Sequence, residues 1–206
     1  MTTKEFKRNY LSHYSLLETD FVSTFNYVSV EEDNYKTYSN MYLKLLLAVG
    51  SEIDILKKFV AVLYNHSFNE KKDNVNAELL KQFPDIKTIE IKFRNNGKVY
   101  MPWNFEKEPE WWTVYNEIKH NRLEQANKFD DTKKYYQYAN LENAIHSLAA
   151  LFSLELIAYR KIAIDSGEKL FVPVIKSLFS INNSYWNEIQ HGMGFVFLGG
   201  TVYMED

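Results

Sequence analysis

Four side chains with the chemistry to bind an anion or exchange a proton lie close together in the sequence, at Asn116, Lys119, His120 and Arg122. An imidazole exchanges protons near neutral pH, and lysine and arginine carry positive charge that can hold phosphate. We therefore predict that His120 and Arg122 are catalytic, with His120 transferring a proton and Arg122 stabilising charge. Asn116 and Lys119 are the predicted binding residues beside them.

The segment that carries these side chains has the periodicity of an amphipathic helix over residues 109–126. At about 100° per residue, one face is apolar and Arg122 falls near its centre. The residues of that face are Trp111, Val114, Tyr115 and Ile118. A buried arginine requires an acid, because an unpaired buried charge is very costly. We therefore expect the guanidinium to be removed from water and paired with a carboxylate.

Two acids are candidate partners of Arg122. Glu52 lies at the edge of the apolar stripe of its predicted helix, and Glu155 lies on the inner face of a later one, whereas Asp54 points away. We expect Glu52 or Glu155 to meet Arg122. The pair is either a structural ion pair that fixes helix register or part of a functional groove to which Glu52 contributes.

The other histidines are weaker candidates. His146 is expected to be an interior polar group, His66 ends a helix, and His191 lies in a glycine-flanked turn. No His-x-x-x-His spacing, cysteine, phosphate-binding loop or dinucleotide fingerprint is present. We therefore expect no metal ion and no cofactor.

The composition limits the classes of partner. The net charge is −3, so the chain lacks the overall basic field of a strong nucleic-acid binder, and any RNA contact must be local. The start of the chain has no apolar run typical of a signal peptide. The most apolar segment, residues 144–164, contains charged side chains and is unsuited to span a membrane. We expect a soluble, cytoplasmic protein that does not associate with membranes.

The elements that must position these side chains are mainly helices, because only four prolines and seven glycines interrupt the chain. Apolar residues recur at three- and four-residue steps over residues 39–65, which predicts a helix. Gly50, in its middle, indicates close approach of another backbone. A second long helix is predicted over residues 140–165, capped by Asn140 and apolar almost all round, so it should be central.

A β-hairpin is predicted over residues 88–101. Ile89, Ile91 and Phe93 alternate with charged residues, and Asn96-Gly97 provides a turn. Residues 166–206 are predicted to be a C-terminal extension, formed either of strands or of packed loops. We expect one domain over residues 1–206, with its bundle core at about residues 35–165.

The order of the helices resembles the HEPN superfamily, in particular its bacterial members. The resemblance rests on Ser51-Glu52-Ile53-Asp54 in one long helix and on the run from Tyr115 to Arg122 before an apolar one. It covers roughly residues 35–165 and implies a mainly α, HEPN-like helical bundle with a small β-hairpin. Members often dimerise. Many are metal-independent RNases of toxin–antitoxin, phage-defence and CRISPR systems, and others have lost catalysis and serve in binding or signalling.

The family's RNase motif is an arginine followed, four to six residues later, by a histidine. In it the imidazole acts as general base or acid and the arginine stabilises phosphorane charge. This chain departs from the motif, since His120 precedes Arg122. One literal match runs from Arg8 to His13, but it lies in the first predicted helix, whereas the family places its motif late, and short motifs also arise by chance.

Two functions follow from this resemblance. In the first, RNA or a nucleotide binds in a groove and is cleaved without metal; the groove is lined by Glu52, Asn116, Lys119, His120 and Arg122. In the second, the chain is a non-catalytic module that forms a homodimer or docks a protein partner, with Phe195–Leu198 as the candidate surface.

Several aromatic residues surround Lys119 in the sequence. They either join the hairpin to the bundle as core residues or stack bases next to this lysine. The residues are Trp103, Trp111, Trp112 and Tyr115.

Overall fold

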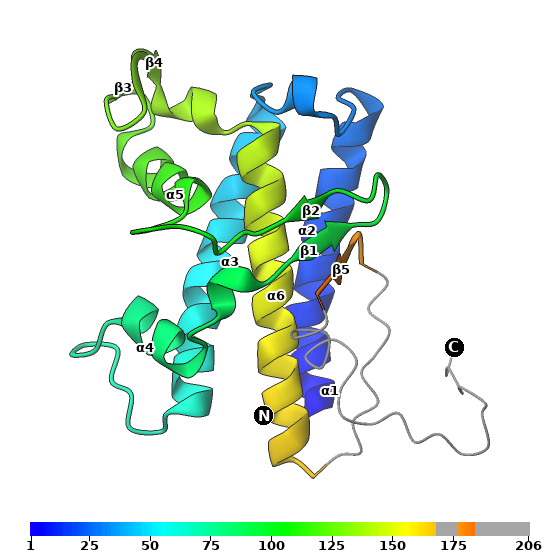
Figure 1. Cartoon of the computed structure of the whole chain (residues 1–206), viewed down its shortest axis with the longest axis vertical. Coiled ribbons are helices and arrows are strands. Elements are labelled where there is room, and N and C mark those ends of the chain that lie inside the picture. Colours follow the sequence, from blue (N-terminus) through cyan, green and yellow to red (C-terminus); the bar gives the residue numbers. More distant parts are fainter. Residues whose placement is uncertain (168–176, 184–206) are drawn as a thin grey trace.

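The computed structural model describes residues 1–167 and 177–183, and this part of the chain is mainly helical, as predicted. Two long helices, α3 (Asn40–Tyr64) and α6 (Leu141–Asp165), lie side by side, and α2 (Ser12–Ser23) packs along them (Figure 1). An isolated bridge between Tyr38 and Asn140 joins the starts of α3 and α6, so these two helices run parallel.

Side-chain caps define where the long helices begin. The Ser39 hydroxyl accepts a hydrogen bond from the Tyr42 amide (3.1 Å), and the Asn140 side chain accepts one from the Asn143 amide (2.9 Å). Each bond satisfies a backbone donor that the first helical turn leaves unpaired. Both helices therefore begin within one residue of the predicted positions.

The first helical segment contains a π turn. The order is α1 (Thr3–Phe6), the π-helical η1 (Lys7–Leu11) and then α2, without a break. Such turns hold one extra residue and are found mostly as single turns within α-helices, frequently at functional sites.

A three-stranded antiparallel sheet crosses α6 (Figure 1). The predicted hairpin forms β1 (Ile91–Phe93) and β2 (Val99–Tyr100), with Ile91 opposite Tyr100. The third strand, β5 (Phe179–Ile181), comes from the C-terminal extension and pairs with the other edge of β1.

The remaining elements are short. A second, two-stranded sheet follows α5, and single 3-10 turns connect the longer helices. These elements are η2 (Thr24–Asn26), η3 (Glu32–Asn34), α4 (Val75–Gln82), η4 (Ile86–Thr88), α5 (Glu110–Asn121), β3 (Gln125–Ala126), β4 (Asp130–Lys134) and η5 (Tyr135–Tyr138).

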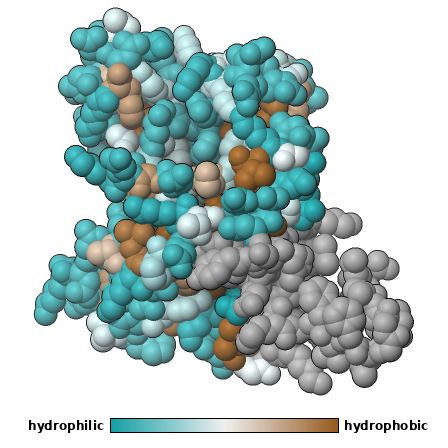
Figure 2. Space-filling view, viewed as in Figure 1, coloured by the Kyte–Doolittle hydropathy of each residue, from teal (hydrophilic) through white to brown (hydrophobic). Residues whose placement is uncertain are grey.

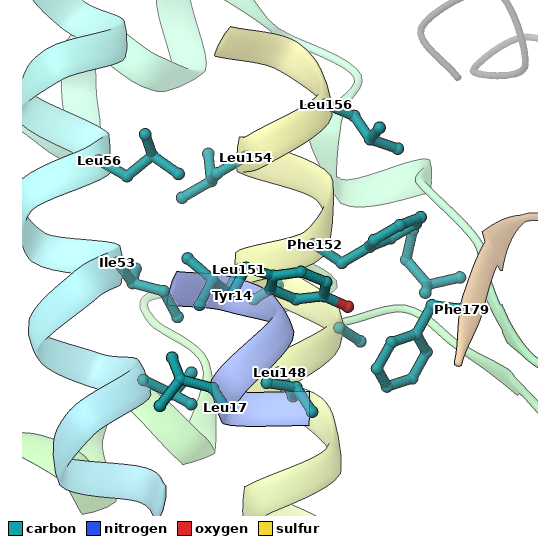
Figure 3. Close-up of a cluster of buried hydrophobic side chains, with 14 of the residues drawn as sticks. Tyr14, Leu17, Ile53, Leu56, Leu148, Leu151, Phe152, Leu154, Leu156 and Phe179 are labelled. Carbon is teal, nitrogen blue, oxygen red and sulfur yellow. The ribbon is translucent and has the colours of Figure 1, made fainter. Parts of the chain in front are cut away.

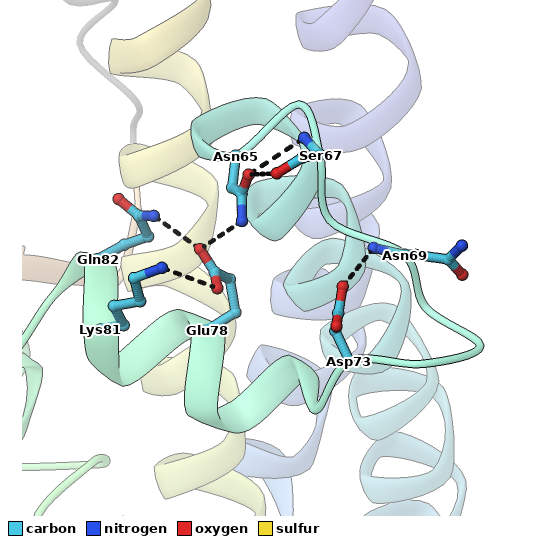
Figure 4. A network of polar contacts seen from close by, with 7 residues as sticks. All are labelled: Asn65, Ser67, Asn69, Asp73, Glu78, Lys81 and Gln82. Atoms are coloured by element: carbon cyan, nitrogen blue, oxygen red, sulfur yellow. Dashed lines mark hydrogen bonds and ion pairs between the residues drawn. The ribbon is translucent and has the colours of Figure 1, made fainter.

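Polar contacts fix α4 against the end of α3 (Figure 4). The Glu78 carboxylate accepts hydrogen bonds from the amides of Asn65 (3.1 Å) and Gln82 (2.7 Å). At the start of α4, the Asn74 side chain accepts from the Asn76 amide (2.9 Å). The position of α4 matters because it brings the Asn76 side chain to Lys57 of α3.

The main core lies between α2, α3, α6 and the sheet. Figure 3 shows Tyr14, Phe152 and Phe179 meeting where α2, α6 and β5 come together, with Ile53 of α3 close by. On the face seen in Figure 2, the surface is mostly hydrophilic, with small separate apolar patches. Among the described residues, no helix combines the length and apolarity needed to cross a bilayer.

Gly50 marks a close approach, as predicted, but the neighbour is a ring rather than a backbone. A Cβ atom built on Gly50 would lie 2.6 Å from Cε2 of Tyr115. The missing side chain therefore lets α5 pack directly on α3.

Candidate functional site

The last two turns of α5 carry the predicted binding residues on or near the surface. Lys119 and His120 are exposed and Asn116 is half-buried. The Lys119 ammonium lies 3.4 Å from the Tyr115 hydroxyl. This end of α5 is thus a polar surface, although one α5 acid, Glu117, is buried and paired with Lys128.

Arg122 does not lie where the sequence predicted. It is exposed, and among the described residues no carboxylate pairs with it, so the expected burial and pairing with Glu52 or Glu155 are wrong. The reason is that α5 ends at Asn121 and Arg122 is its C-cap. The helical wheel assumed that the helix continued to residue 126, and the guanidinium instead lies past the packed turns.

Glu52 faces α2 and not α5. Its Oε1 atom lies 3.5 Å from Nε2 of His13. Positions two apart on a helix lie about 200° apart around its axis, so Glu52 points away from the side on which Gly50 contacts α5. The structure thus separates Glu52 from Asn116, Lys119 and His120.

A second carboxylate lies behind this pair. Glu155 of α6 is 2% exposed, and its Oε2 atom has no hydrogen-bond partner among the described residues. Burial, together with the nearby charge of Glu52, raises the pKa of Glu155 to about 8. Glu155 is therefore mainly protonated at neutral pH. Burial and the same two acids also raise the pKa of the Tyr10 hydroxyl.

Arg8 precedes His13 by five residues, and the π turn lies mostly between them. Positions five apart on a regular α-helix lie about 140° apart, and the wider π turn reduces that angle. Arg8 and His13 are both exposed, and the Arg8 Nε–H donates to Oδ1 of Asn9 (3.4 Å). Tyr10, His13, Glu52 and Glu155 interact with one another, and Arg8 lies on the same helical segment as Tyr10 and His13; we call these five residues the His13 cluster.

A pocket lies on another side of α3, where it meets α4 and the segment before α5. At its base is Lys57, which is 2% exposed and lies over the Trp112 ring, 3.4 Å from the centroid. Lys57 was not predicted from the sequence as a site residue. The available signal was its spacing, because Lys57 follows Ile53 by four residues and precedes Val60 by three, on the apolar stripe of the helix.

The two tryptophans nearest the core act structurally. Trp103 and Trp111 are buried with their rings 5.6 Å apart, and their indole N–H groups donate to Ser153 Oγ (2.8 Å) and to the Pro102 carbonyl (2.9 Å). They join the hairpin connection to the bundle, as the core interpretation predicts. Trp112 is half-buried and differs from them in facing a lysine.

The remaining histidines occupy different settings. Burial lowers the pKa of His146 to about 4, and its ring packs edge-on against Tyr100, as expected of a neutral interior group. His66 is exposed just after α3. His191 and Phe195–Leu198 lie outside the described residues. Within the described ranges, no three acidic or histidine side chains are grouped so that they could hold a metal ion.

Comparison with known proteins found no matching protein-family model, and no curated protein or solved structure with significant similarity.

Proposed function

We propose that this protein binds RNA and cleaves it without a metal ion at the His13 cluster. The observation that carries the proposal is the 3.5 Å pairing of the His13 imidazole with the Glu52 carboxylate, next to the π turn that bears Arg8. A histidine that acts as a base needs a second group to orient it and a reachable ring edge. His13 has both, since 45% of its side chain is exposed.

Each residue has a role in the proposed reaction. His13 takes the proton from a ribose 2′-hydroxyl, whose oxygen attacks the adjacent phosphorus. The bond from phosphorus to the 5′-oxygen breaks, that oxygen takes up a proton, and a 2′,3′-cyclic phosphate remains. Arg8 stabilises the charge that develops on the phosphate oxygens, and Glu52 holds the imidazole in position.

The charge balance of the cluster supports binding of an anion. Burial keeps Glu155 mainly protonated at neutral pH, so this acid adds little negative charge to the cluster. Lys4 and Lys7 are exposed on the same N-terminal segment as Arg8. Glu5 lies between them, so three cations and one acid give this segment a net charge of +2 in a chain whose net charge is −3, and this local basic region supports a local RNA contact.

His120 and Arg122 are the alternative catalytic pair, and the geometry supports them less well. Both are exposed at the end of α5, and within the described part of the chain neither forms an ion pair with a carboxylate. Glu117, the acid whose charge interacts with His120, is instead paired with Lys128 and accepts a hydrogen bond from Asn121. The imidazole of His120 is therefore less well oriented than that of His13. Asn116 and Lys119 remain candidates for contacts with RNA.

The test is incubation of single-stranded RNA with the protein in EDTA. We expect cleavage by wild type that leaves 2′,3′-cyclic phosphate ends. His13→Ala should slow it by about 10²–10⁴-fold, the usual contribution of a general acid or base. His120→Ala is the matched control and should cleave at the wild-type rate. DNA of the same sequence should stay intact because it lacks the 2′-hydroxyl.

Two results would contradict the proposal. Equal cleavage by wild type and His13→Ala would exclude His13, and loss of activity in His120→Ala alone would return the site to α5. RNA that stays intact with wild type would rule out cleavage and leave the non-catalytic docking module as the better interpretation.

A further inference from the structure

The Lys57 pocket has the lining of a small-molecule site. It is a recess open to solvent, and its cavity volume is about 50 Å³. Its wall is mostly apolar and aromatic. The residues that line it include Lys57, Asn76, Phe105, Lys107, Glu108 and Trp112.

The Lys57 ammonium is buried without a carboxylate of its own among the described residues. Its Nζ donates to Oδ1 of Asn76 (3.0 Å). Of the acids near it, Asp54 is bound by Lys58 (3.1 Å), and Glu108 accepts from Thr113 Oγ1 (2.7 Å). An ammonium has three N–H donors. Among the described residues, the Lys57 ammonium contacts the Asn76 side chain and the Trp112 ring.

A buried ammonium without an ion pair raises the free energy of the folded state, because burial removes its hydration. Burial lowers the pKa of Lys57 to about 8, against the opposing effect of Asp54 and Glu108. The amine is therefore still mainly charged at pH 7. A buried charge without an ion pair, at the base of an aromatic pocket, has the features of a binding site for an anion.

We propose that this pocket binds a small aromatic monocarboxylate, with its carboxylate on Lys57 and its ring against Trp112 and Phe105. The charges favour one negative charge. Lys57 and Lys107 contribute +2 and Glu108 contributes −1, so the net charge of the lining is +1. A phosphate dianion would exceed that charge and lie close to Glu108. The Asn76 side-chain nitrogen donates to no described residue and is available to the second carboxylate oxygen.

This inference is independent of the proposed RNA function. Lys57 lies five positions after Glu52 on α3, about 140° around its axis, so the pocket and the His13 cluster occupy different sides of the helix. Lys57→Met should therefore leave RNA cleavage in EDTA unchanged. A failure of ligand binding then leaves the proposed RNA function untouched, and a failure of RNA cleavage leaves the proposed pocket untouched.

The experiment is a calorimetric titration with 2-naphthoate, with tryptophan fluorescence as a second readout because Trp112 lines the pocket. Saturable one-to-one binding is expected. Lys57→Met should weaken it at least about tenfold, since a charge-assisted hydrogen bond contributes at least that much. Lys72→Met, at an exposed position of the connection between α3 and α4, is the matched control and should bind as wild type does. If Lys57→Met fails to fold, Asn76→Ala replaces it and should also weaken binding.

The chemistry of the ligand is tested with two analogues and with pH. The neutral 2-naphthamide should bind at least about tenfold more weakly, and 2-naphthyl phosphate more weakly than the carboxylate. Above pH 8 the affinity should fall by about tenfold per pH unit, because the carboxylate binds the protonated amine. The other charged side chains near Lys57 or in the pocket lining are Asp54, Lys58, Lys107 and Glu108.

Four results would overturn the proposal. These are absence of saturable binding at millimolar naphthoate, unchanged affinity in Lys57→Met, equal affinity for the amide, and tighter binding of the phosphate. The last of these would reassign the pocket to phosphorylated ligands.

Discussion

Glu155 couples the stability of the protein to pH through one buried side chain. Its pKa of about 8 in the folded state compares with an ordinary value of 4.5. The folded state keeps this proton at pH values where the unfolded chain has released it. The corresponding stabilisation is complete below pH 4.5 and is lost as the pH rises to 8. The shift is worth at most about 5 kcal/mol.

We predict that Glu155→Gln removes this dependence, because the amide is neutral at every pH. Urea unfolding at pH 5 and pH 9 measures the effect. The two proteins should be similar at pH 5, and the variant should be the more stable by a few kcal/mol at pH 9. Glu106→Gln changes an exposed acid and is the matched control. Parallel pH profiles of wild type and Glu155→Gln would show that Glu155 is ionised in the folded protein.

The burial of a single residue was predicted correctly from the sequence only where the bounds of its helix were also predicted correctly. The wheel placed Glu155 on an inner face, and it is buried. The same wheel failed for Arg122, because a wheel has no meaning past the last packed turn. The pairing of Glu52 with His13 was not predictable, since it depends on how α2 lies against α3, and helical periodicity does not encode that position.

The contact between α3 and α5 depends on the absence of one side chain. In an exposed helix, replacing Gly50 by alanine would gain about 1 kcal/mol of helix propensity. Here the new Cβ would lie 2.6 Å from Tyr115 Cε2, so the ring and α5 must move. Overpacking of this kind typically costs 1–3 kcal/mol, which exceeds the gain.

We therefore predict that Gly50→Ala lowers the free energy of unfolding by up to about 2 kcal/mol. Thermal or urea unfolding is the measurement, and a double-mutant cycle supplies the control. In a Tyr115→Ala background the ring is gone, and Gly50→Ala should become stabilising. The same sign of effect in both backgrounds would mean that the ring does not limit the approach of α5.

At the level of elements, the periodic segments and the hairpin were predictable, and the strands outside the hairpin were not. The long helices agree with prediction at their starts, and the hairpin forms as expected. β4 was missed because its sequence, Asp-Asp-Thr-Lys-Lys, is exposed and charged and has no alternation. β5 was left open because three residues are too few for a period, and its pairing with β1 spans over eighty residues of sequence. The π turn has no signature in the residue pattern either.

One buried acid, Glu18, links the N-terminal helical segment to the last described segment of the chain. Glu18 of α2 is buried and accepts hydrogen bonds from the Tyr14 hydroxyl (2.5 Å), Ser177 Oγ (2.6 Å) and the Leu178 amide (3.0 Å). Through these bonds α2 holds the entry to β5, the edge strand of the sheet over α6. Hydrogen bonds to a charged group contribute about 1.5–3 kcal/mol each.

A competing contact also holds β5, since the buried Phe179 ring packs against Phe93 and Phe152 with centroids 5.6 and 6.0 Å apart. Deleting a buried phenylalanine costs about 3–5 kcal/mol, which is similar to the loss of two bonds to Glu18. A change in the global free energy of unfolding therefore does not distinguish the two contacts. Local unfolding of β5 does distinguish them, because the Glu18 hydrogen bonds hold the backbone at the start of this strand.

We predict that in Glu18→Ala the amides of residues 178–181 exchange with solvent faster than in wild type, while those of α3 keep the protection that the remaining global stability allows. Hydrogen exchange followed by mass spectrometry of peptides is the measurement. Glu18→Gln is the control, because its amide oxygen still accepts, and it should recover part of the protection. If β5 stays protected in Glu18→Ala but opens in Phe179→Ala, ring packing and not the Glu18 carboxylate holds the strand in place.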